Sequence, residues 1–325
     1  MSIIFFHRNK KAGFSINKVT QTVISNIPIR REYFVPDRGA SVLSIIKNLF
    51  YVWKHHDKKS INHVTGDVHY CILALIGCKS VLTIHDTVSL DFVHLPQYKH
   101  FLIKWLWFKF PLKIATKVVC ISEETRRHIL KYTKRRDIEV IHNAVDPMFV
   151  QSPKVFSAAK PKVLLIGTGA NKNLIRTFEA IKGMNCLVII VGKLNDEQRI
   201  ALDKYHIDYI NKVGLSDEEL LEEYINCDIV SFISLFEGFG MIVVEANKVG
   251  RPVICSDIPV LKEIGGNGAL YVNPKDIDDM RRGFNKILSD EQLRNQLVLD
   301  GYENAKRFDV EVILRQWIRL YDSMR

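Results

Sequence analysis

The chain has 325 residues, with 46 Lys and Arg against 36 Asp and Glu. Hydrophobic residues make up 47% and charged residues 25%, which excludes a disordered, collagenous or coiled-coil chain and at this length indicates two domains. Residues 1–155 hold 24 Lys and Arg against 11 Asp and Glu, whereas residues 156–325 hold 22 against 25. An anionic partner is therefore expected to meet the first half of the chain.

The six cysteines form no Cys-x-x-Cys pair, and most lie in apolar runs. We expect buried free thiols in a reducing compartment rather than disulfides or metal ligands. The amino terminus lacks a basic segment followed by a long apolar one, so no signal peptide is expected. The most lipophilic run, residues 101–112, is shorter than the roughly 20 residues that span a bilayer. These features predict a cytoplasmic protein.

Apolar runs alternate with helical patterns through the first half of the chain. Helices are predicted over residues 40–54 and from residue 123, with Ser122 as N-cap. The predicted strands cover residues 2–7, 79–85, 117–121 and 138–141. This alternation predicts an α/β domain with a mainly parallel sheet.

A loop-like stretch with two prolines, residues 151–161, predicts a domain boundary between residues 155 and 156. Beyond it the alternation resumes, with a capping box at Ser216–Glu219 and a last helix over residues 310–324. The predicted strands here cover residues 162–166, 187–191, 228–233, 252–256 and 269–272. Two such α/β domains in tandem are expected to bind a ligand between them, at the carboxyl ends of their strands.

The segment Glu237-Gly238-Phe239-Gly240, with Glu245 further on, follows a predicted strand and opens a helix. The glycines let backbone approach a ligand closely, and the N–H groups of the helix start suit a phosphate. The two carboxylates can accept hydrogen bonds from hydroxyl groups on either side of that anion. A sugar, a diphosphate and a ribose in a row fit this layout. The structural alternative is that Glu237 is a solvated turn residue and Glu245 an exposed helix position.

This segment resembles the Glu-Gly-Phe-Gly-x4-Glu signature of glycosyltransferase family 4, whose members are retaining enzymes of the GT-B fold. Residues 250–263 and 269–274 continue the resemblance. It implies two Rossmann-like α/β domains facing each other across a cleft. Residues 1–155 would then bind the acceptor and residues 156–309 the nucleotide-sugar donor, while the helix over residues 310–325 packs back on the first domain.

The loop of residues 167–173 resembles the strand–loop–helix that holds the donor diphosphate in this family. The resemblance implies catalytic roles for Lys172 and Glu237. The implied donor-binding residues are Gly167, Gly169, Lys172, Asn173, Val213, Glu237, Gly238, Phe239, Gly240, Met241 and Glu245. The rival interpretation is a dinucleotide-binding loop, but its third glycine is missing.

Three pieces of the first half resemble the family more loosely: residues 8–15, Thr83-Ile84-His85-Asp86, and residues 140–146. In the family, the histidine of the second piece lies over the transferred sugar, which implies a catalytic role for His85. The acceptor-binding residues implied are Arg8, Gly13, His85 and Asp86. Asp86 either orients His85 or caps the next helix. We expect the remaining histidines to be structural.

Residues 98–117 combine aromatic side chains with five lysines. Helical spacing predicts that Phe101, Trp105, Phe108 and Leu112 line one face. Two alternatives stay open, since Trp and Lys suit the surface of an anionic membrane, whereas a buried helix would let its lysines reach outward to water.

The resemblance thus implies a retaining glycosyltransferase that moves a sugar from a nucleotide-diphosphate sugar to a glycan or lipid-linked acceptor in surface polysaccharide synthesis, at the inner membrane face. No cofactor is expected, and no metal ion is expected to be required. Lys172 and the helix start near Gly240 can stabilise the leaving diphosphate. A GT-B sugar-nucleotide epimerase is one alternative. A basic nucleic-acid-binding protein is the other, which leaves the signature segment unexplained, so no nucleic-acid partner is expected.

Overall fold

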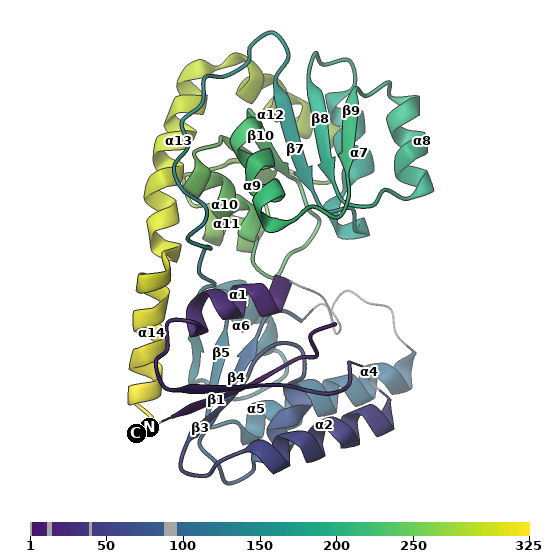
Figure 1. The fold of residues 1–325 in the computed structure, drawn as a ribbon. Coiled ribbons are helices and arrows are strands. Elements are labelled where there is room, and N and C mark those ends of the chain that lie inside the picture. The colour runs from purple at the N-terminus through teal and green to yellow at the C-terminus, as the bar shows by residue number, and fades with distance from the viewer. Residues whose placement is uncertain (1, 12–14, 39–40, 88–95) are drawn as a thin grey trace. The chain divides into compact units, whose positions relative to one another are not determined.

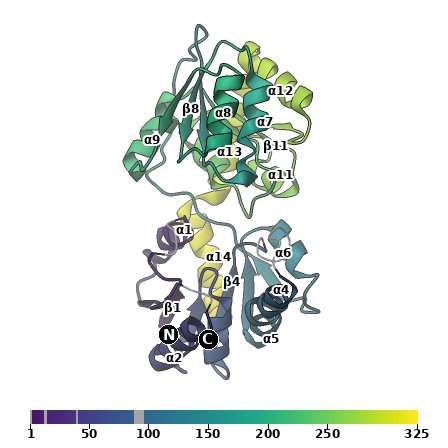
Figure 2. The ribbon, with the colours of Figure 1, turned by 90° about the vertical axis from the view of Figure 1, so that its right-hand side faces the viewer.

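The computed structural model describes residues 2–11, 15–38, 41–87 and 96–325. It divides into two compact units: unit 1 comprises Met1–Ala144 with Val310–Arg325, and unit 2 comprises Val145–Asp309. Each unit contains a six-stranded parallel sheet with helices against it (Figures 1 and 2). The prediction of two α/β domains with parallel sheets is confirmed.

The two units divide between Ala144 and Val145, whereas the sequence predicted a boundary between residues 155 and 156. The reason is that the following segment packs against unit 2. The Val145 N–H donates to the Phe308 carbonyl at 2.9 Å, and the Phe149 ring lies edge-on to Tyr224 at 5.4 Å. Residues 145–155 are thus part of unit 2, and helix α14 (Val310–Asp322) belongs to unit 1.

In unit 1 the strand order is β2-β1-β3-β4-β5-β6, with every neighbouring pair parallel. The strands are β1 (Ile3–His7), β2 (Arg30–Phe34), β3 (Ile61–Val64), β4 (Ser80–Ile84), β5 (Lys117–Cys120) and β6 (Ile138–Val140). Four of them, β1, β3, β4 and β5, are nearly continuous buried runs, as expected for a parallel sheet covered on both faces. The edge strand β2 is polar and partly exposed, so its sequence carries no strand pattern.

Two layers of helices cover the sheet of unit 1. One apolar cluster joins it to α2, η1, η2, α5 and α6, and another joins its other side to α1 and α14. The bounds are α1 (Ser15–Ile24), α2 (Val42–His55), η1 (His69–Leu75), α4 (Gln97–Ile103), η2 (Lys104–Lys109), α5 (Phe110–Ile114) and α6 (Glu123–Ile129). As predicted, the Ser122 side chain caps α6 by accepting from the Thr125 N–H at 3.1 Å.

The prediction that Phe101, Trp105, Phe108 and Leu112 line one face is wrong. The π-helical turn η2 shifts the register, so Phe108 and Leu112 are buried while Phe101 is exposed.

In unit 2 the strand order is β12-β11-β10-β7-β8-β9. The strands are β7 (Lys162–Ile166), β8 (Leu187–Val191), β9 (Tyr209–Lys212), β10 (Ile229–Phe232), β11 (Val253–Ser256) and β12 (Leu270–Val272). The helices are η3 (Ala170–Lys172), α7 (Leu174–Ile181), α8 (Asp196–Lys204), α9 (Asp217–Asn226), α10 (Met241–Val249), α11 (Pro259–Gly265), α12 (Ile277–Ser289), α13 (Glu291–Ala305) and η4 (Lys306–Phe308). The predicted capping box of Ser216 and Glu219 opens α9.

All six cysteines are buried and unbridged, which confirms the expectation of free thiols. Within the described residues, no helix has both the length and the apolar character needed to cross a bilayer.

Candidate functional site

In the sheet of unit 2, the order in which the chain adds strands reverses between β7 and β10. From β7 the chain adds β8 and β9 on one side, then returns to add β10, β11 and β12 on the other. In an open parallel sheet, the loops that follow the two strands at such a point diverge and leave room for a ligand at their carboxyl ends. Here those loops are residues 167–173 and residues 233–240, the two segments that carry the predicted donor site.

The loop after β7 contains two residues with a left-handed backbone conformation, Gly167 and Asn173. Gly167 has φ +87°, and a Cβ there would lie 3.0 Å from Cε of Lys172. Asn173 is also left-handed, with φ +57°, and its side-chain amide donates to the Pro274 carbonyl at 2.7 Å. Gly169 has an ordinary negative φ, but a Cβ added to it would lie only 2.9 Å from Oδ1 of Asn171. The loop therefore holds Lys172 in a fixed place.

The loop after β10 leads into helix α10 through Gly240. This glycine has φ +108°, and a Cβ would lie only 2.5 Å from Leu261 Cδ2. Phe239 is buried edge-on against Phe308, with ring centres 5.8 Å apart, and thereby anchors the turn. Met241 is the first residue of the helix. The first N–H groups of a helix have no carbonyl partner within it, so this turn presents positive partial charge.

The two loops are joined by direct contacts around Glu237. Lys172 Nζ lies 2.6 Å from Glu237 Oε1, and the Asn171 amide donates to the same oxygen at 3.1 Å. The Leu235 N–H donates to the Asn171 carbonyl at 2.7 Å. Lys172 Nζ also lies 4.5 Å from the centre of the Phe232 ring. The structure thus brings together Lys172 and Glu237, which the sequence placed 65 residues apart.

Asn171 binds Glu237, and the sequence had not assigned it to the site. It lies inside the predicted loop, next to Lys172, and that position was the only signal for it.

Glu245 lies in the second turn of α10 and is held by a residue with no motif of its own. The hydroxyl of Tyr224, at the end of α9, donates to Glu245 Oε2 at 2.6 Å. Tyr224 is completely buried, and burial together with the adjacent carboxylate raises its pKa well above the ordinary value. Tyr224 therefore stays a proton donor. Its sequence environment resembles an ordinary core position, so no pattern could have assigned it.

The other predicted donor residues lie along the same edge of the sheet. Gly238 lies in the turn between Glu237 and Gly240. Val213 directly follows β9, and 60% of its surface is exposed. The preceding residue, Lys212, accepts a hydrogen bond at its carbonyl from the Gly192 N–H at 2.8 Å. It lies two strands from Gly167, away from the Lys172–Glu237 contact.

Unit 1 has a corresponding change of direction between β1 and β3. Arg8 follows β1, and its Nη1 lies 3.9 Å from Asp67 Oδ1, after β3. His7 Nδ1 and Thr65 Oγ1 are 2.8 Å apart at the same edge. No motif in the sequence had assigned a role to Asp67. Gly13, predicted to bind acceptor, lies outside the described residues.

His85 directly follows β4 and lies inside a group of buried histidines. Burial, followed by the charges of His69 and Arg8, lowers its pKa to about 3, so the imidazole is neutral at pH 7. Its Nε2 is buried and finds no hydrogen-bond partner among the described residues. We refer to this group as the histidine cluster, and its members are His7, His63, His69 and His85.

His85 also lines a small cavity of unit 1, of about 30 Å³. Thr83, His63 and Tyr321 line it too, and they form a chain in which His63 Nε2 meets Thr83 Oγ1 at 2.7 Å and His63 Nδ1 meets the Tyr321 hydroxyl at 2.8 Å. The volume suffices for a water molecule or one ligand hydroxyl. Asp86 is half-buried directly after His85.

No group of three or more His, Cys, Asp or Glu side chains within the described ranges is arranged to hold a metal ion.

Two family models match the chain and together cover most of it. One, described as "Glycosyl transferases group 1", matches residues 153–304, and the other, "Glycosyltransferase Family 4", matches residues 7–149. An uncharacterized glycosyltransferase of Methanocaldococcus jannaschii is 24% identical over 99% of this chain and 90% of its own length. An O-antigen chain mannosyltransferase of Salmonella typhimurium is 28% identical over 64% of this chain and 62% of its own.

A third relative is N,N'-diacetylbacillosaminyl-diphospho-undecaprenol alpha-1,3-N-acetylgalactosaminyltransferase of Campylobacter jejuni. It is 22% identical over 86% of this chain and 82% of its own.

Solved structures resemble the chain over its whole length. Sucrose-phosphate synthase from Thermosynechococcus elongatus has a TM-score of 0.81 at 16% identity, covering 100% of this chain and 99% of that one. HepE of Anabaena, in complex with UDP and glucose, has a TM-score of 0.76 at 16% identity, covering 99% and 100%. At such identities the likeness establishes the fold.

Proposed function

The chain belongs to glycosyltransferase family 4 and has the GT-B fold, and from this premise we propose that it moves a sugar, with retention of anomeric configuration, from a nucleotide-diphosphate sugar to a glycan or lipid-linked acceptor. The acceptor would be an intermediate of surface polysaccharide synthesis at the inner face of the membrane. Relatives named for O-antigen chains and for a diphospho-undecaprenol substrate support this acceptor class.

The contact between Lys172 and Glu237 carries the proposal. A half-buried cation and a half-buried carboxylate meet at the switch point of the unit 2 sheet, beside the start of α10. A diphosphate there would bind the Lys172 ammonium group and the N–H groups near Gly240. Both stabilise the charge that grows on the leaving phosphate as the glycosidic bond breaks, and neither requires a metal ion.

The two glutamates would hold the donor from both sides of the diphosphate. Glu237, released from Lys172, would accept hydrogen bonds from hydroxyl groups of the sugar. Glu245 would accept from the ribose, with Tyr224 fixing the carboxylate through its other oxygen. Val213 and Gly214 lie further along the sheet edge, where they would border the base.

Unit 1 would supply the acceptor side. His85 is neutral, so its Nε2 can take part in a hydrogen bond with a sugar hydroxyl without adding a charge. Arg8 and Asp86 lie after β1 and β4, at the same carboxyl edge, and Gly13 is proposed from the sequence alone. We assign no protein nucleophile. The acceptor hydroxyl would attack on the face from which the diphosphate departs, and the phosphate oxygen would take its proton.

The proposal is tested by binding first and by product second. A thermal-shift screen of nucleoside diphosphates and their sugars identifies the donor, because a ligand stabilises the folded state by mass action. Transfer to a lipid-linked glycan is then measured with and without EDTA, and the anomeric configuration of the product is read by NMR. An inverted product, loss of activity in EDTA, or conversion of the donor without acceptor would each contradict the corresponding part.

A further inference from the structure

Unit 2 contains a cavity at the edge of its sheet opposite the donor loops. The residues that line it precede β7, β10 and β11 or belong to the start of α13, so it lies at the amino ends of the strands. Its volume is about 350 Å³, within the range of roughly 300–1,000 Å³ that small-molecule sites occupy. We call it the amino-edge cavity. Its charged and amide side chains are Lys154, Asp228, Arg251, Glu291, Arg294 and Asn295.

Arg294 is held on one side of its guanidinium group and unoccupied on the other. Its Nη1 donates to the carbonyls of Ile287 and Leu288, in the last turn of α12, at 3.0 and 2.9 Å. Its guanidinium carbon lies 3.8 Å from the centre of the Phe156 ring. The hydrogens on Nε and Nη2 have no acceptor within the described residues. This is the edge through which a guanidinium binds a phosphate by two parallel hydrogen bonds, so Arg294 is preorganised for an anion.

Arg251 brings a second guanidinium charge to the cavity. It is only 2% exposed, and its hydrogens go to four backbone carbonyls at 2.7–3.0 Å, those of Ser152, Tyr224, Ile225 and Gly250. Burial lowers its pKa below the ordinary value, because a desolvated cation is costly. Within the described part of the chain, neither Arg251 nor Arg294 forms an ion pair with a carboxylate. An anion bound beside them would offset both charges.

The cavity remains positive once its internal ion pair is counted. Asp228 pairs with Lys154 and accepts from the Ser157 and Lys162 N–H groups at 3.0 and 2.8 Å, so its charge is balanced. The other acid of the lining is Glu291, which forms no ion pair among the described residues. Two guanidinium groups and one carboxylate are therefore left without a charged partner. A phosphate ester, with a charge of about −1.5 to −2 at pH 7, supplies the missing negative charge.

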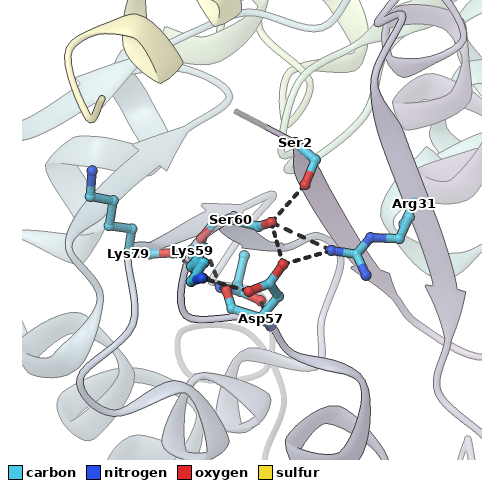
Figure 3. Close-up of polar contacts among 7 residues, drawn as sticks. Ser2, Arg31, Asp57, Lys59, Ser60 and Lys79 are labelled. Atoms are coloured by element: carbon cyan, nitrogen blue, oxygen red, sulfur yellow. Dashed lines mark hydrogen bonds and ion pairs between the residues drawn. The ribbon is translucent and has the colours of Figure 1, made fainter.

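The amino edge of unit 1 shows a contrasting, purely structural arginine. There Arg31 Nη2 donates to Asp57 Oδ2 at 2.9 Å and to the Ser60 hydroxyl at 3.4 Å (Figure 3). Asp57 also accepts from the Lys59 N–H at 2.9 Å and from the Ser60 hydroxyl at 2.8 Å. The charge of Arg31 is thus balanced within the chain. The two arginines of the amino-edge cavity differ, because backbone carbonyls and not carboxylates accept their hydrogens.

The rest of the lining suits the sugar of a sugar phosphate. Glu291 and Asn295 are one helical turn apart at the start of α13, so both side chains lie on the same side of the helix. A carboxylate accepts hydrogen bonds from hydroxyl groups, and an amide both accepts and donates them. Phe156 and Val298 add apolar surface that the carbon face of a sugar ring can cover.

We infer that the amino-edge cavity binds a small sugar phosphate. The phosphate lies on the Nε–Nη2 edge of Arg294, beside Arg251, and the hydroxyl groups meet the start of α13. This site is separate from the donor site, because Lys172 follows the carboxyl end of β7 at the other edge of the sheet. The inference goes beyond the proposed function and does not depend on it.

The first test is isothermal titration calorimetry of the full chain. The probes are glucose 1-phosphate, glucose 6-phosphate and mannose 1-phosphate, compared with inorganic phosphate and with glucose. At least one sugar phosphate is expected to bind about tenfold more tightly than inorganic phosphate, because its hydroxyl groups add hydrogen bonds. Arg294→Gln is expected to weaken this binding at least about tenfold. Arg199→Gln is the matched control, since it removes an exposed arginine of α8 in the same unit, and it should bind like the wild type.

Two further variants separate the cavity from the fold and from the donor site. Asn295 is exposed, and its side chain makes no hydrogen bond within the described residues, so Asn295→Glu should fold normally. The added negative charge is expected to weaken sugar-phosphate binding at least about tenfold. Lys172→Gln is expected to leave the same binding within about twofold of the wild type, since the donor loops lie at the opposite edge. Binding that is lost in Lys172→Gln and kept in Arg294→Gln would assign the phosphate to the donor site and overturn the inference.

A tryptophan in place of Phe156 gives a local readout of the cavity. The four tryptophans of the chain all belong to unit 1, so Phe156→Trp places a single tryptophan of unit 2 against Arg294. Its emission is expected to change with the Kd found by calorimetry, while wild-type emission stays constant. Three results would overturn the inference: no sugar phosphate binds the wild type, binding survives in both Arg294→Gln and Asn295→Glu, or the Phe156→Trp emission ignores a ligand that calorimetry detects. UDP titrations of the same proteins report the donor site separately.

Discussion

Separating Lys172 from Glu237 should change donor binding in opposite directions, depending on which partner is altered. In the ligand-free protein Lys172 Nζ and Glu237 Oε1 lie 2.6 Å apart, with side chains only 19% and 14% exposed. A diphosphate that recruits Lys172 must first compete with Glu237. Removing the lysine removes a charge-assisted hydrogen bond to phosphate, whereas removing the carboxylate charge removes the competitor.

The magnitudes follow from the burial of the pair. A hydrogen bond with a charged partner contributes about 1.5–3 kcal/mol, so Lys172→Gln should bind the nucleoside diphosphate roughly 10- to 100-fold more weakly. An ion pair that keeps some contact with water is worth about 1 kcal/mol, so Glu237→Gln should bind it up to about fivefold more tightly. Turnover of Glu237→Gln should nevertheless fall roughly a hundredfold, because its contacts to the sugar are lost.

Isothermal titration calorimetry with UDP and GDP measures both effects, and Lys286→Gln is the matched control. That residue is an exposed lysine of α12 in the same unit, so its loss tests the effect of net charge alone. If Glu237→Gln weakened binding as much as Lys172→Gln does, Lys172 would bridge carboxylate and phosphate together and the competition argument would fail. Equal affinities for all four proteins would remove the diphosphate from this site.

Three further outcomes are expected. Tyr224→Phe removes the hydroxyl donated to Glu245, so the KM for donor should rise about tenfold with little change in kcat, and an unchanged KM would contradict the positioning role. Gly240→Ala should lower the free energy of unfolding, measured by urea titration, by about 2–4 kcal/mol, because the new Cβ would meet Leu261 and the residue has a positive φ. Gly183→Ala is the control: Gly183 also has a positive φ, but no atom lies near its Cβ position, so the loss should be only about 1 kcal/mol. The pKa values of His63 and His85 are lowered from 6.5 to about 3, so the unfolded chain binds more protons below pH 6.5. The free energy of unfolding should then fall from pH 7 to pH 5 by up to about 1.4 kcal/mol per pH unit and histidine, and a flat profile would refute the buried neutral cluster.

Much of unit 2 was predictable because its strands are short apolar runs between turn residues. β7 and β8 have the predicted bounds, residues 162–166 and 187–191. The resemblances of the loop 167–173 and of the signature segment also predicted that Lys172 and Glu237 belong to one site, and the two side chains are in contact. Tyr224 could not be found this way, since a buried tyrosine on an amphipathic helix looks like core whether or not its hydroxyl meets a carboxylate.

Helix α2 shows a different limit of sequence patterns. Periodicity predicted a helix over residues 40–54, and a stripe of large apolar side chains ordinarily faces the core. Here the large side chains of Phe50 and Trp53 are exposed instead, and the inner side is chosen by Asn48, whose partner Tyr70 lies 22 residues further along the chain. Only a three-dimensional contact decides between two apolar faces of one helix.

Unit 1 is assembled from two separate stretches of chain, and this sets an order of events during synthesis. Residues 145–309 form a continuous segment that can fold as soon as it leaves the ribosome. Unit 1 must wait with this side of its sheet covered by α1 alone, until Trp317 and Leu320 of α14 join the cluster that contains Phe5 and Val81. The half made first is therefore finished last. A chain that ends before residue 310 would expose the apolar side chains of this sheet to chaperones, although all residues of unit 2 are present.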